Sequence, residues 1–564
     1  MEHAKTKQVA GWLAAGLGLW LAAGTAWAQH LAPVNPAFAK WMKDGGKEAA
    51  AARRAAARAR GDEGPSLGYV PEVADLSYLA DLNDSMECGV SAGRPARYDL
   101  RDEGRVTPVR DQGTHPTCWA HAAMASLEPS AKASVGVDPD WSEGHMAANH
   151  GWSASVEDGG NAMMASGYLL RWGGPVAEAD GDSPAASPEA HVQRTRWVPG
   201  KVAALDNDRI KDAIVAHGPL YAGFWWSEGY YDPAHASFRA PAEALGRSPN
   251  HAVALVGWDD TYPRGNFRDP PPGDGAWLAK NSWGEDWGDG GFFWVSYWDA
   301  TLGRNTMHAF AGVEAADNYD AVWEHDPLGF VGSVGGTGST AWGANAFTAA
   351  SATKIAAVGF WALAPRTSYH LWVYAGGTAG KPRSGRLLSD QSGNLDDAGY
   401  VTVPLETPAE VAAGERFTVV AKLTTPGYKY PLAVEYQVHG ATDAANAAKG
   451  QSFLSLDGQT WSDFTEKVHA TANFCLKAYA IMYNVDDKEH FLVYRLKMQH
   501  YIWDEDKMSA SGYKNPTGKY YIYLLDRQMN TDKLDISKFI NCRISENDKG
   551  QPICVSGEEI RSVI

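Results

Sequence analysis

One short stretch, residues 111–121, constrains the possible fold of this chain of 564 residues more than any other stretch does. It places Cys118 directly after Pro116 and Thr117, two residue types that favour the first turn of a helix. The residues that follow are mostly good helix formers, so the sequence predicts a helix that begins near Cys118. A thiol at the N-terminus of a helix lies at the positive end of the helix dipole, which favours the thiolate. Cys118 is therefore a candidate nucleophile, and Gln112 precedes it by six residues (118 − 112).

A thiolate nucleophile also needs a proton carrier and a donor for the oxyanion that it creates. His251 heads an apolar, strand-like run and lies 133 residues after Cys118 (251 − 118). Asn281 lies 163 residues after it (281 − 118), in a run that also contains Trp283 and Trp287. These residue types predict a nucleophile, a base and a third group that orients the base.

The motifs stand in a set order along the chain: Gln-Gly and Cys-Trp around residue 115, then His-Ala, then Asn-Ser-Trp-Gly. In that order they resemble the core motifs of the papain-like cysteine peptidases. The histidine spacing fits the roughly 130–150 residues typical of this family, whereas the asparagine is slightly late. The resemblance implies an α+β papain-like two-lobed peptidase domain over residues 96–318, with a helical lobe and a β-barrel-like lobe.

The resemblance also implies a role for each of these residues. Cys118 would be the nucleophile, His251 would hold its proton, and Asn281 would orient the histidine ring. Gln112 and the backbone N–H of Cys118 would form the oxyanion hole. The supporting residues are three tryptophans expected beside the site: Trp119, Trp283 and Trp287.

Gly159 and Gly160 resemble the glycine pair that lines the non-primed side of the cleft in this family. Glycine there lets a substrate backbone approach closely, and a plain turn before a helix at 162–170 is the alternative. The chain departs from the family at His115, where the family usually has a second cysteine in a disulfide. Because Cys118 is the only cysteine in this part of the chain, the domain is expected to fold without a disulfide.

Four histidines lie near the nucleophile in sequence and raise the question of a metal site: His115, His121, His145 and His150. No carboxylate or second cysteine accompanies them at an interval typical of metal ligands. We therefore interpret them as surface or packing residues, and we expect neither a metal nor another cofactor.

The sequence pattern at the N-terminus predicts that the protein is exported. Residues 1–28 begin with Lys5 and Lys7, continue as an apolar run and end in the small-x-small motif Ala26-Trp27-Ala28, as in a signal peptide. A membrane anchor is the alternative for these residues. Elsewhere in the sequence, no run approaches the roughly 18 apolar residues of a transmembrane helix. We therefore expect a secreted, periplasmic or cell-surface protein without a transmembrane segment after signal cleavage. Residues 29–95 would then form a pro-region that either blocks the cleft, as in papain-like zymogens, or is a disordered spacer.

From about residue 319 the sequence changes to strand-like runs separated by turn-forming residues. This pattern predicts an all-β sandwich domain over residues 319–482. Residues 326–329 and 342–347 resemble the lectin-like β domain that follows the peptidase domain in some bacterial members. That name describes a fold, so a glycan or cell-surface ligand of this domain stays an open question. The predicted strands are 354–361, 369–374, 416–421 and 432–436.

Composition and cysteine usage bear on the possible partners of the chain and on whether disulfides hold it together. The formal net charge of −17 argues against nucleic acid as a partner of the whole chain. Five cysteines are too few for a scaffold built on disulfides. Residues 483–564 resemble no family known to us and form a C-terminal extension of unknown fold, in which Cys542 and Cys554 could pair.

Two functions fit this pattern. The first is a secreted cysteine peptidase that hydrolyses polypeptide substrates through a Cys-His-Asn triad and an acyl-enzyme (thioester) intermediate. The alternative is an adhesion or glycan-binding protein that uses an inactive peptidase fold as a scaffold. The complete set of Gln112, Cys118, His251 and Asn281 favours the peptidase, because a scaffold has no need of all four. We expect the β domain to add targeting, so that its deletion spares small-peptide cleavage, unless it braces the peptidase domain.

Overall fold

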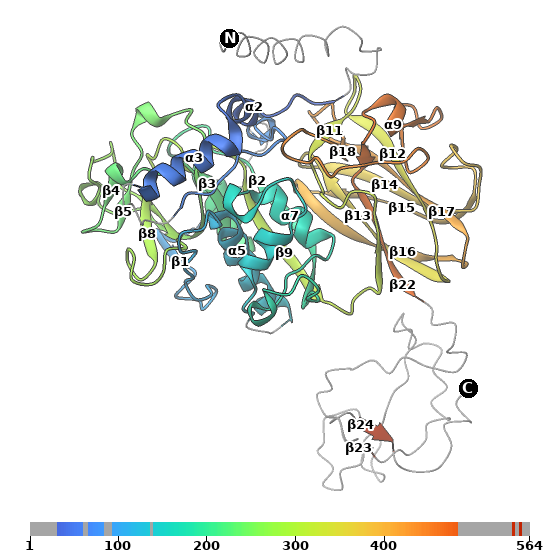
Figure 1. The fold of residues 1–564 in the computed structure, drawn as a ribbon, viewed down its shortest axis with the longest axis horizontal. Coiled ribbons are helices and arrows are strands. Elements are labelled where there is room, and N and C mark those ends of the chain that lie inside the picture. The colour runs from blue at the N-terminus through green and yellow to red at the C-terminus, as the bar shows by residue number, and fades with distance from the viewer. Residues whose placement is uncertain are drawn as a thin grey trace, which may run out of the picture. The chain divides into compact units, whose positions relative to one another are not determined.

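The computed structural model describes residues 31–59, 66–83, 93–135 and 139–482, and two short strands near the C-terminus (Figure 1). The chain divides into a first unit that ends at Tyr483 and a second unit that begins at Asn484. In the described part of the second unit, β23 (Ile544–Glu546) pairs antiparallel with β24 (Pro552–Cys554). The predicted signal peptide and the side chains of Cys542 and Cys554 lie outside the described residues.

The first described part of the chain, residues 31–59 and 66–83, is called the N-terminal segment here. It contains α2 (Pro36–Lys43), α3 (Gly46–Ala59) and α4 (Tyr78–Asn83). Asn35 caps α2 by accepting a hydrogen bond of 2.9 Å from the backbone N–H of Ala37. α3 is formed by the alanine- and arginine-rich run, whose residue types favour a helix. The segment also buries Phe38 and Leu79 in the main core, so these described residues are folded rather than a disordered spacer.

The peptidase part, residues 97–315, is built around α5 (Cys118–Val135). α5 begins at Cys118, as the sequence predicts, and its many alanines are buried, which lets neighbouring elements approach the helix closely. α7 (Ala162–Leu170) is buried along its whole length and has the bounds that the sequence predicts. The other two helices are α6 (Glu143–Asn149) and α8 (Asp208–His217).

The sheet of the peptidase part brings two site residues together. Its neighbouring strands are, in spatial order, β2 (Ala190–Val198), β9 (Met307–Ala315), β3 (Leu220–Phe224), β6 (His251–Asp259), β7 (Ala276–Lys280), β8 (Phe292–Ser296), β5 (Ser237–Phe238) and β4 (Tyr231–Asp232), and β1 (Arg97–Asp99) pairs with β6. β6 and β7 are antiparallel, with Ala254 opposite Lys280. This register places His251, the first residue of β6, beside Asn281, which directly follows β7.

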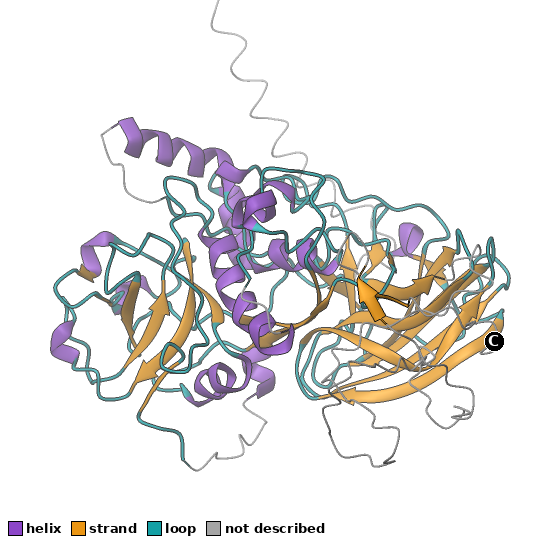
Figure 2. Ribbon diagram, turned by 90° about the horizontal axis from the view of Figure 1, so that it is seen from below, coloured by secondary structure: helices purple, strands orange, loops and turns teal. Residues whose placement is uncertain are grey.

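The β domain, residues 321–482, consists almost entirely of strands, shown in orange on the right of Figure 2. One sheet contains β10 (Ala321–Trp323), β22 (Leu476–Met482), β13 (Thr353–Ala362) and β16 (Gly399–Val411). A second contains β15 (Arg386–Leu395), β14 (Thr367–Ala375), β17 (Arg416–Thr424), β12 (Thr340–Thr348), β19 (Ser452–Ser455) and β20 (Ser462–Asp463). A third contains β11 (Gly332–Val334), β18 (Leu432–Glu435) and β21 (Asn473–Phe474), and α9 (Phe464–Lys467) is the helix of this domain. The four predicted strands correspond to β13, β14, β17 and β18, so the all-β prediction is confirmed.

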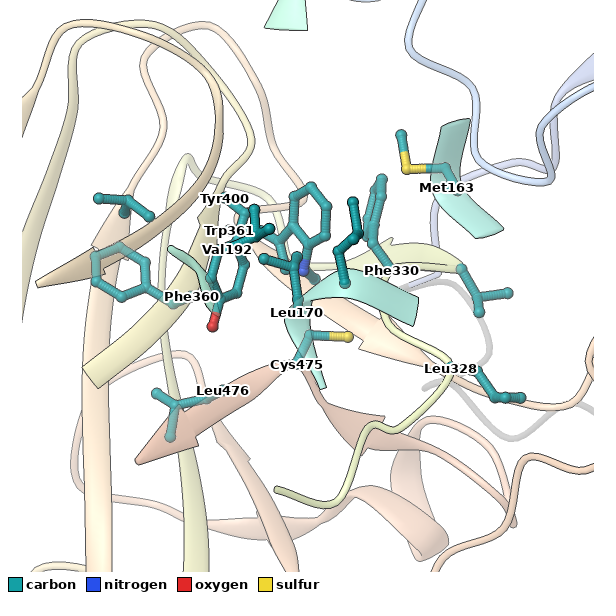
Figure 3. Close-up of a cluster of buried hydrophobic side chains, with 14 of the residues drawn as sticks. Met163, Leu170, Val192, Leu328, Phe330, Phe360, Trp361, Tyr400, Cys475 and Leu476 are labelled. Carbon is teal, nitrogen blue, oxygen red and sulfur yellow. The ribbon is translucent and has the colours of Figure 1, made fainter. Parts of the chain in front are cut away.

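The β domain and the peptidase part share one sheet and one core. β16 pairs with β2 through Val401 and Arg194, and the backbone N–H of Trp197 donates to the carbonyl of Ala398 at 2.9 Å. Trp197 stacks on Trp361 of the β domain, with ring centroids 5.3 Å apart. Figure 3 shows the shared core, in which Met163, Leu170 and Val192 of the peptidase part lie among Leu328, Phe330, Trp361 and Tyr400 of the β domain. The two parts are therefore packed together rather than tethered.

The part of the chain that the structure describes contains no helix that is both long and apolar enough to cross a membrane.

Candidate active site

Cys118 lies at the start of α5 and is fully buried, with 0 % of its surface exposed. The backbone N–H groups of Ala252, Gly68 and Trp119 lie within hydrogen-bonding range of its sulfur and favour the thiolate. Burial opposes them and is the larger effect, so it raises the pKa of the thiol to about 11. Because Ala252 directly follows His251, the packing of α5 on β6 brings the thiol next to the predicted base.

His251 and Asn281 form the contact that the sequence predicts. Nε2 of His251 lies 2.9 Å from Oδ1 of Asn281, and both side chains are buried. Nδ1 of His251 has no hydrogen-bond partner among the described residues, so it is the ring nitrogen left for the thiol. Burial lowers the pKa of His251 to about 4, although the hydrogen bond to Asn281 opposes this shift. With the thiol pKa raised and the histidine pKa lowered, both groups are neutral near pH 7 in this state of the protein.

A wall of tryptophans covers the histidine–asparagine contact. The ring of Trp283 stacks on His251 at 4.7 Å with an interplanar angle of 22°. Trp287 and Trp226 both meet Trp283 edge-on, at 4.8 Å and 4.9 Å. The sequence predicts Trp283 and Trp287 but misses Trp226. Its only sequence signal is its position after a short apolar strand, where its backbone N–H donates to Asn250, the neighbour of His251.

Gln112 is held in one orientation by Ser282. Its backbone N–H donates to the carbonyl of Ser282 at 2.8 Å, and its Oε1 accepts from the Ser282 hydroxyl at 2.7 Å. Its Nε2 is therefore free to donate, and it does so to the backbone carbonyls of Ser66 and His115, each at 2.7 Å. An amide donor fixed in this way can also stabilise the negative oxygen of a tetrahedral intermediate.

The glycine pair lies where a side chain would block another group. A Cβ added at Gly160 would lie 2.5 Å from the ring of Trp119, which packs beneath it. A Cβ added at Gly159, which has a φ of +84°, would lie 2.2 Å from the carbonyl oxygen of Gly68. Gly159 is thus required for the close approach of the backbone of the N-terminal segment, and Gly160 for the packing of the Trp119 ring.

Residues 66–70 of the N-terminal segment lie over the nucleophile. The N–H of Gly160 donates to the carbonyl of Gly68 at 2.9 Å, and the N–H of Val70 donates to the carbonyl of Gly160 at 2.8 Å, which gives a parallel bridge. The backbone N–H of Tyr69 donates to the carbonyl of Asn250 at 3.1 Å. The sequence of residues 61–71 is Gly/Pro-rich and has only the pattern of a loop, because a contact made across the fold leaves no local pattern.

The histidines near the nucleophile have packing or surface partners. His115 pairs with Glu157 at 2.6 Å and is exposed, and Nδ1 of His145 contacts the hydroxyl of Tyr168 at 2.7 Å. Two contacts are with the backbone: Nδ1 of His121 lies 3.0 Å from the carbonyl of Thr117, and Nδ1 of His150 accepts from the N–H of Trp152 at 3.0 Å. Among the described residues, no group of three or more His, Cys, Asp or Glu side chains is arranged to hold a metal ion.

Comparison with known protein families identifies both parts of the chain. Residues 94–311 match the papain family of cysteine proteases, and residues 322–480 match the lectin-like domain. Cathepsin J of Rattus norvegicus is 33 % identical over 242 residues, which covers 38 % of this chain and 65 % of the relative. The chain spans between 56 % and 65 % of the length of the first curated relatives that it matches.

Two solved structures share the arrangement of both parts. The crystal structure of the cysteine protease and lectin-like domains of Cwp84, a surface layer associated protein of Clostridium difficile, has a TM-score of 0.65 and 24 % identity, and covers 80 % of this chain and 98 % of that one. A structure of the clostridial cysteine protease Cwp84 after propeptide cleavage has a TM-score of 0.60 and 25 % identity, and covers 69 % and 99 %. The fold is therefore a papain-like protease domain followed by a lectin-like all-β domain.

Proposed function

We propose that this chain, which belongs to the papain family of cysteine proteases and carries a lectin-like domain, hydrolyses peptide bonds of polypeptide substrates with Cys118 as its nucleophile. The observation that carries the proposal is the Nε2–Oδ1 contact of 2.9 Å between His251 and Asn281, which leaves Nδ1 of the ring for the thiol. The oriented amide of Gln112 supplies the donor that the reaction also needs.

The proposed reaction has two half-reactions. His251 takes the proton of Cys118, and the thiolate adds to the substrate carbonyl, whose oxygen becomes negative and is stabilised by Gln112 and the backbone N–H of Cys118. His251 then gives the proton to the departing amine, which leaves a thioester on Cys118. Water, deprotonated by His251, attacks the thioester and releases the carboxylic acid and the thiol. Asn281 keeps the ring in the orientation that serves both steps.

A direct experiment tests this function. After removal of the N-terminal segment by an added protease, the protein is incubated with a fluorogenic peptide library and with a thiol-reactive epoxysuccinyl inhibitor. Hydrolysis together with covalent labelling of Cys118 supports the proposal. If neither occurs in a correctly folded protein, the scaffold function is the better interpretation.

His251→Ala is expected to reduce turnover more than Asn281→Ala. His251 carries a proton in both half-reactions, so its loss should reduce kcat by about 10⁴-fold or more. Asn281 only orients the ring, and Trp283 still stacks on it in the Asn281→Ala variant. Steady-state kinetics of both variants on one fluorogenic peptide provide the comparison, with thermal melting to show matched folding. Equal losses would contradict this division of roles.

We also propose that the N-terminal segment keeps the enzyme latent. Residues 66–70 occupy the donor of Gln112 and the backbone of Gly160, so a substrate cannot use either. The ring of Tyr69 lies against Gly223, where an added Cβ would be 2.6 Å from a ring atom. The propeptide cleavage recorded for Cwp84 supports a pro-region role here.

Tyr69→Ala is expected to open the site of the uncleaved protein. Loss of the partly buried ring weakens the packing of the segment against the site, and the access of a reagent to Cys118 should rise by about tenfold. The measurement is the rate of alkylation by iodoacetamide at pH 7, followed at Cys118 by peptide mass mapping. Lys43→Ala, an exposed substitution on α2, is the matched control and should leave the rate unchanged. An unchanged rate in Tyr69→Ala would show that the ring does not hold the segment in place.

Export of the protein is part of the proposal. Residues 1–28 are proposed to be a cleaved signal peptide, with the protein secreted, periplasmic or at the cell surface, where latency protects the cell during synthesis. Determination of the N-terminus of the exported protein tests this directly, because cleavage after Ala28 leaves Gln29 as the first residue.

A further inference from the structure

The N-terminal segment does not end at the nucleophile but continues onto the β domain. The ring of Tyr78 stacks on Tyr428, with centroids 3.7 Å apart and planes 7° from parallel. The hydroxyl of Tyr78 donates to the carbonyl of Leu363 at 2.7 Å. One helical turn later, Leu82 lies against Gly427, where an added Cβ would be 2.3 Å from a Leu82 methyl. The chain that leaves the active site at Val70 is thus seated on the β domain by Tyr78.

The other end of the N-terminal segment reaches the same domain by backbone pairing. The N–H of Ala32 donates to the carbonyl of Ser333 at 2.8 Å, and Leu31 forms an antiparallel bridge with Val334. Ser333 and Val334 belong to β11, the edge strand of the three-stranded sheet, so the segment extends that sheet. Figure 1 shows the segment, in blue, running from the peptidase part to β11.

The two attachments are joined by a further pairing. Val34 forms an antiparallel bridge with Ala74, and the N–H of Asn35 donates to the carbonyl of Val73 at 2.9 Å. The edge of β11 that the segment covers, the ring of Tyr428 and the carbonyl of Leu363 therefore form one surface, which is called the platform here. Ser333 links two of its parts, because its hydroxyl lies 2.8 Å from that of Tyr428.

We propose that the platform binds the flanking part of a polypeptide substrate after the N-terminal segment has been removed. This inference rests on the proposed function and names the substrate class as long, extended polypeptides rather than short peptides. The N-terminal segment is itself a polypeptide in the active site. Its path shows that a polypeptide which continues beyond Gly160 can extend as far as the platform. Its removal leaves the β11 edge and the Tyr428 ring without these partners, and both suit an extended backbone with an aromatic side chain.

The length of the path separates long substrates from short ones. Tyr69, which pairs with Gly160, and Tyr78, which stacks on Tyr428, are nine residues apart (78 − 69). Nine extended residues span at most about 30 Å. A peptide of four or five residues that fills the active site cannot reach the platform, whereas an unfolded protein can. Binding at both places raises the effective concentration of substrate at the nucleophile.

The first test compares a protein substrate with a short peptide. In the protein freed of its N-terminal segment, Tyr428→Ala should raise KM for fluorescein-labelled casein by about threefold to tenfold, the effect of one lost aromatic contact. KM and kcat for a fluorogenic tetrapeptide should not change, which also shows that the variant is folded. Tyr428→Phe keeps the ring and should behave as the wild type. Trp461→Ala alters a different aromatic cluster, around Trp342, and should affect neither substrate.

A second test needs no variant. A synthetic peptide of residues 74–83 contains the part of the segment that contacts Tyr428 and Leu363 of the platform but lacks residues 66–70. It should inhibit casein cleavage by the wild type and leave tetrapeptide cleavage unchanged. Equal inhibition of both substrates, or of neither, would overturn the proposal, and so would a Tyr428→Ala variant that treats casein and tetrapeptide alike.

A binding measurement separates this proposal from the proposed function. Fluorescence anisotropy of labelled casein is followed on Cys118→Ala protein freed of its N-terminal segment, with and without Tyr428→Ala. Weaker binding with Tyr428→Ala supports the platform even if the wild type cleaves nothing, whereas unchanged binding contradicts the platform even if the wild type is an active peptidase.

Discussion

The Cys118→Ala variant is expected to lose peptide hydrolysis by about 10⁵-fold or more while keeping the native fold. Removal of the nucleophile from a triad costs this much because no other group can form the covalent intermediate. The fold should survive because the substitution removes one sulfur atom from the start of α5, and that sulfur contacts backbone N–H groups rather than a partner side chain. Fluorogenic peptide turnover of the variant and the wild type is measured after an added protease has removed the N-terminal segment from both.

Cys475→Ala is the matched control for this prediction. Cys475 is the other free, buried cysteine among the described side chains, and its thiol lies 3.4 Å from the carbonyl of Gly329 in the β domain. Its loss should leave turnover within about twofold of the wild type. An active Cys118→Ala protein, or an equally inactive Cys475→Ala protein with an intact melting transition, would refute the assignment of the nucleophile.

The arrangement of the candidate site residues could be predicted from the sequence because their motifs lie beside local signals for a helix or a strand. Pro116 and Thr117 mark the start of α5, and the apolar run after His251 marks β6. The pairing of β6 with β7 then determines the contact of His251 with Asn281, which needs only the order of two neighbouring strands. For the same reason the strands of the β domain and the helix at 162–170 agree with their predicted positions.

What the sequence could not give depends on contacts between distant segments. Trp226 joins the tryptophan wall only through the packing of its strand beside His251. Residues 66–70 lie in a Gly/Pro-rich stretch, and hydrogen bonds to the backbones of Gly160 and Asn250, which are distant in sequence, hold them over the site. The pairing of Val401 with Arg194 links positions 207 residues apart (401 − 194), and neither strand carries a pattern that names its partner.

The pairing of Val401 with Arg194 bears on whether the β domain is a tethered targeting module or a brace for the peptidase part. A tethered module would only locate the enzyme on its substrate, and small-peptide cleavage would then survive its deletion. The structure instead supports the interpretation that the β domain braces the peptidase part. β16 extends the sheet of the peptidase part, and Trp361 and Phe330 pack against Trp197. Binding of polypeptides at the platform is compatible with the brace, because the platform faces the N-terminal segment and not the shared core.

A fragment of residues 29–318 is therefore expected to be unfolded or aggregated and inactive on all peptides. It lacks the β-domain side chains that pack against Met163, Leu170 and Val192 in the core of Figure 3, and those that pack against Trp197. Burial of each such side chain contributes about 1.5–3 kcal/mol. Exposure of four of them approaches the total of about 5–15 kcal/mol that stabilises a typical domain, and it also leaves a large apolar patch that favours aggregation.

The matched control is a chain that ends after Met482. It keeps the whole β domain and removes the second unit, which begins at Asn484. This chain should stay soluble, melt cooperatively and, after removal of the N-terminal segment, cleave a fluorogenic peptide as fast as the full chain. Circular dichroism, thermal melting and peptide turnover of both proteins give the answer. A soluble 29–318 fragment with near-normal turnover would show that the shared sheet is dispensable and that the β domain serves only to locate the enzyme.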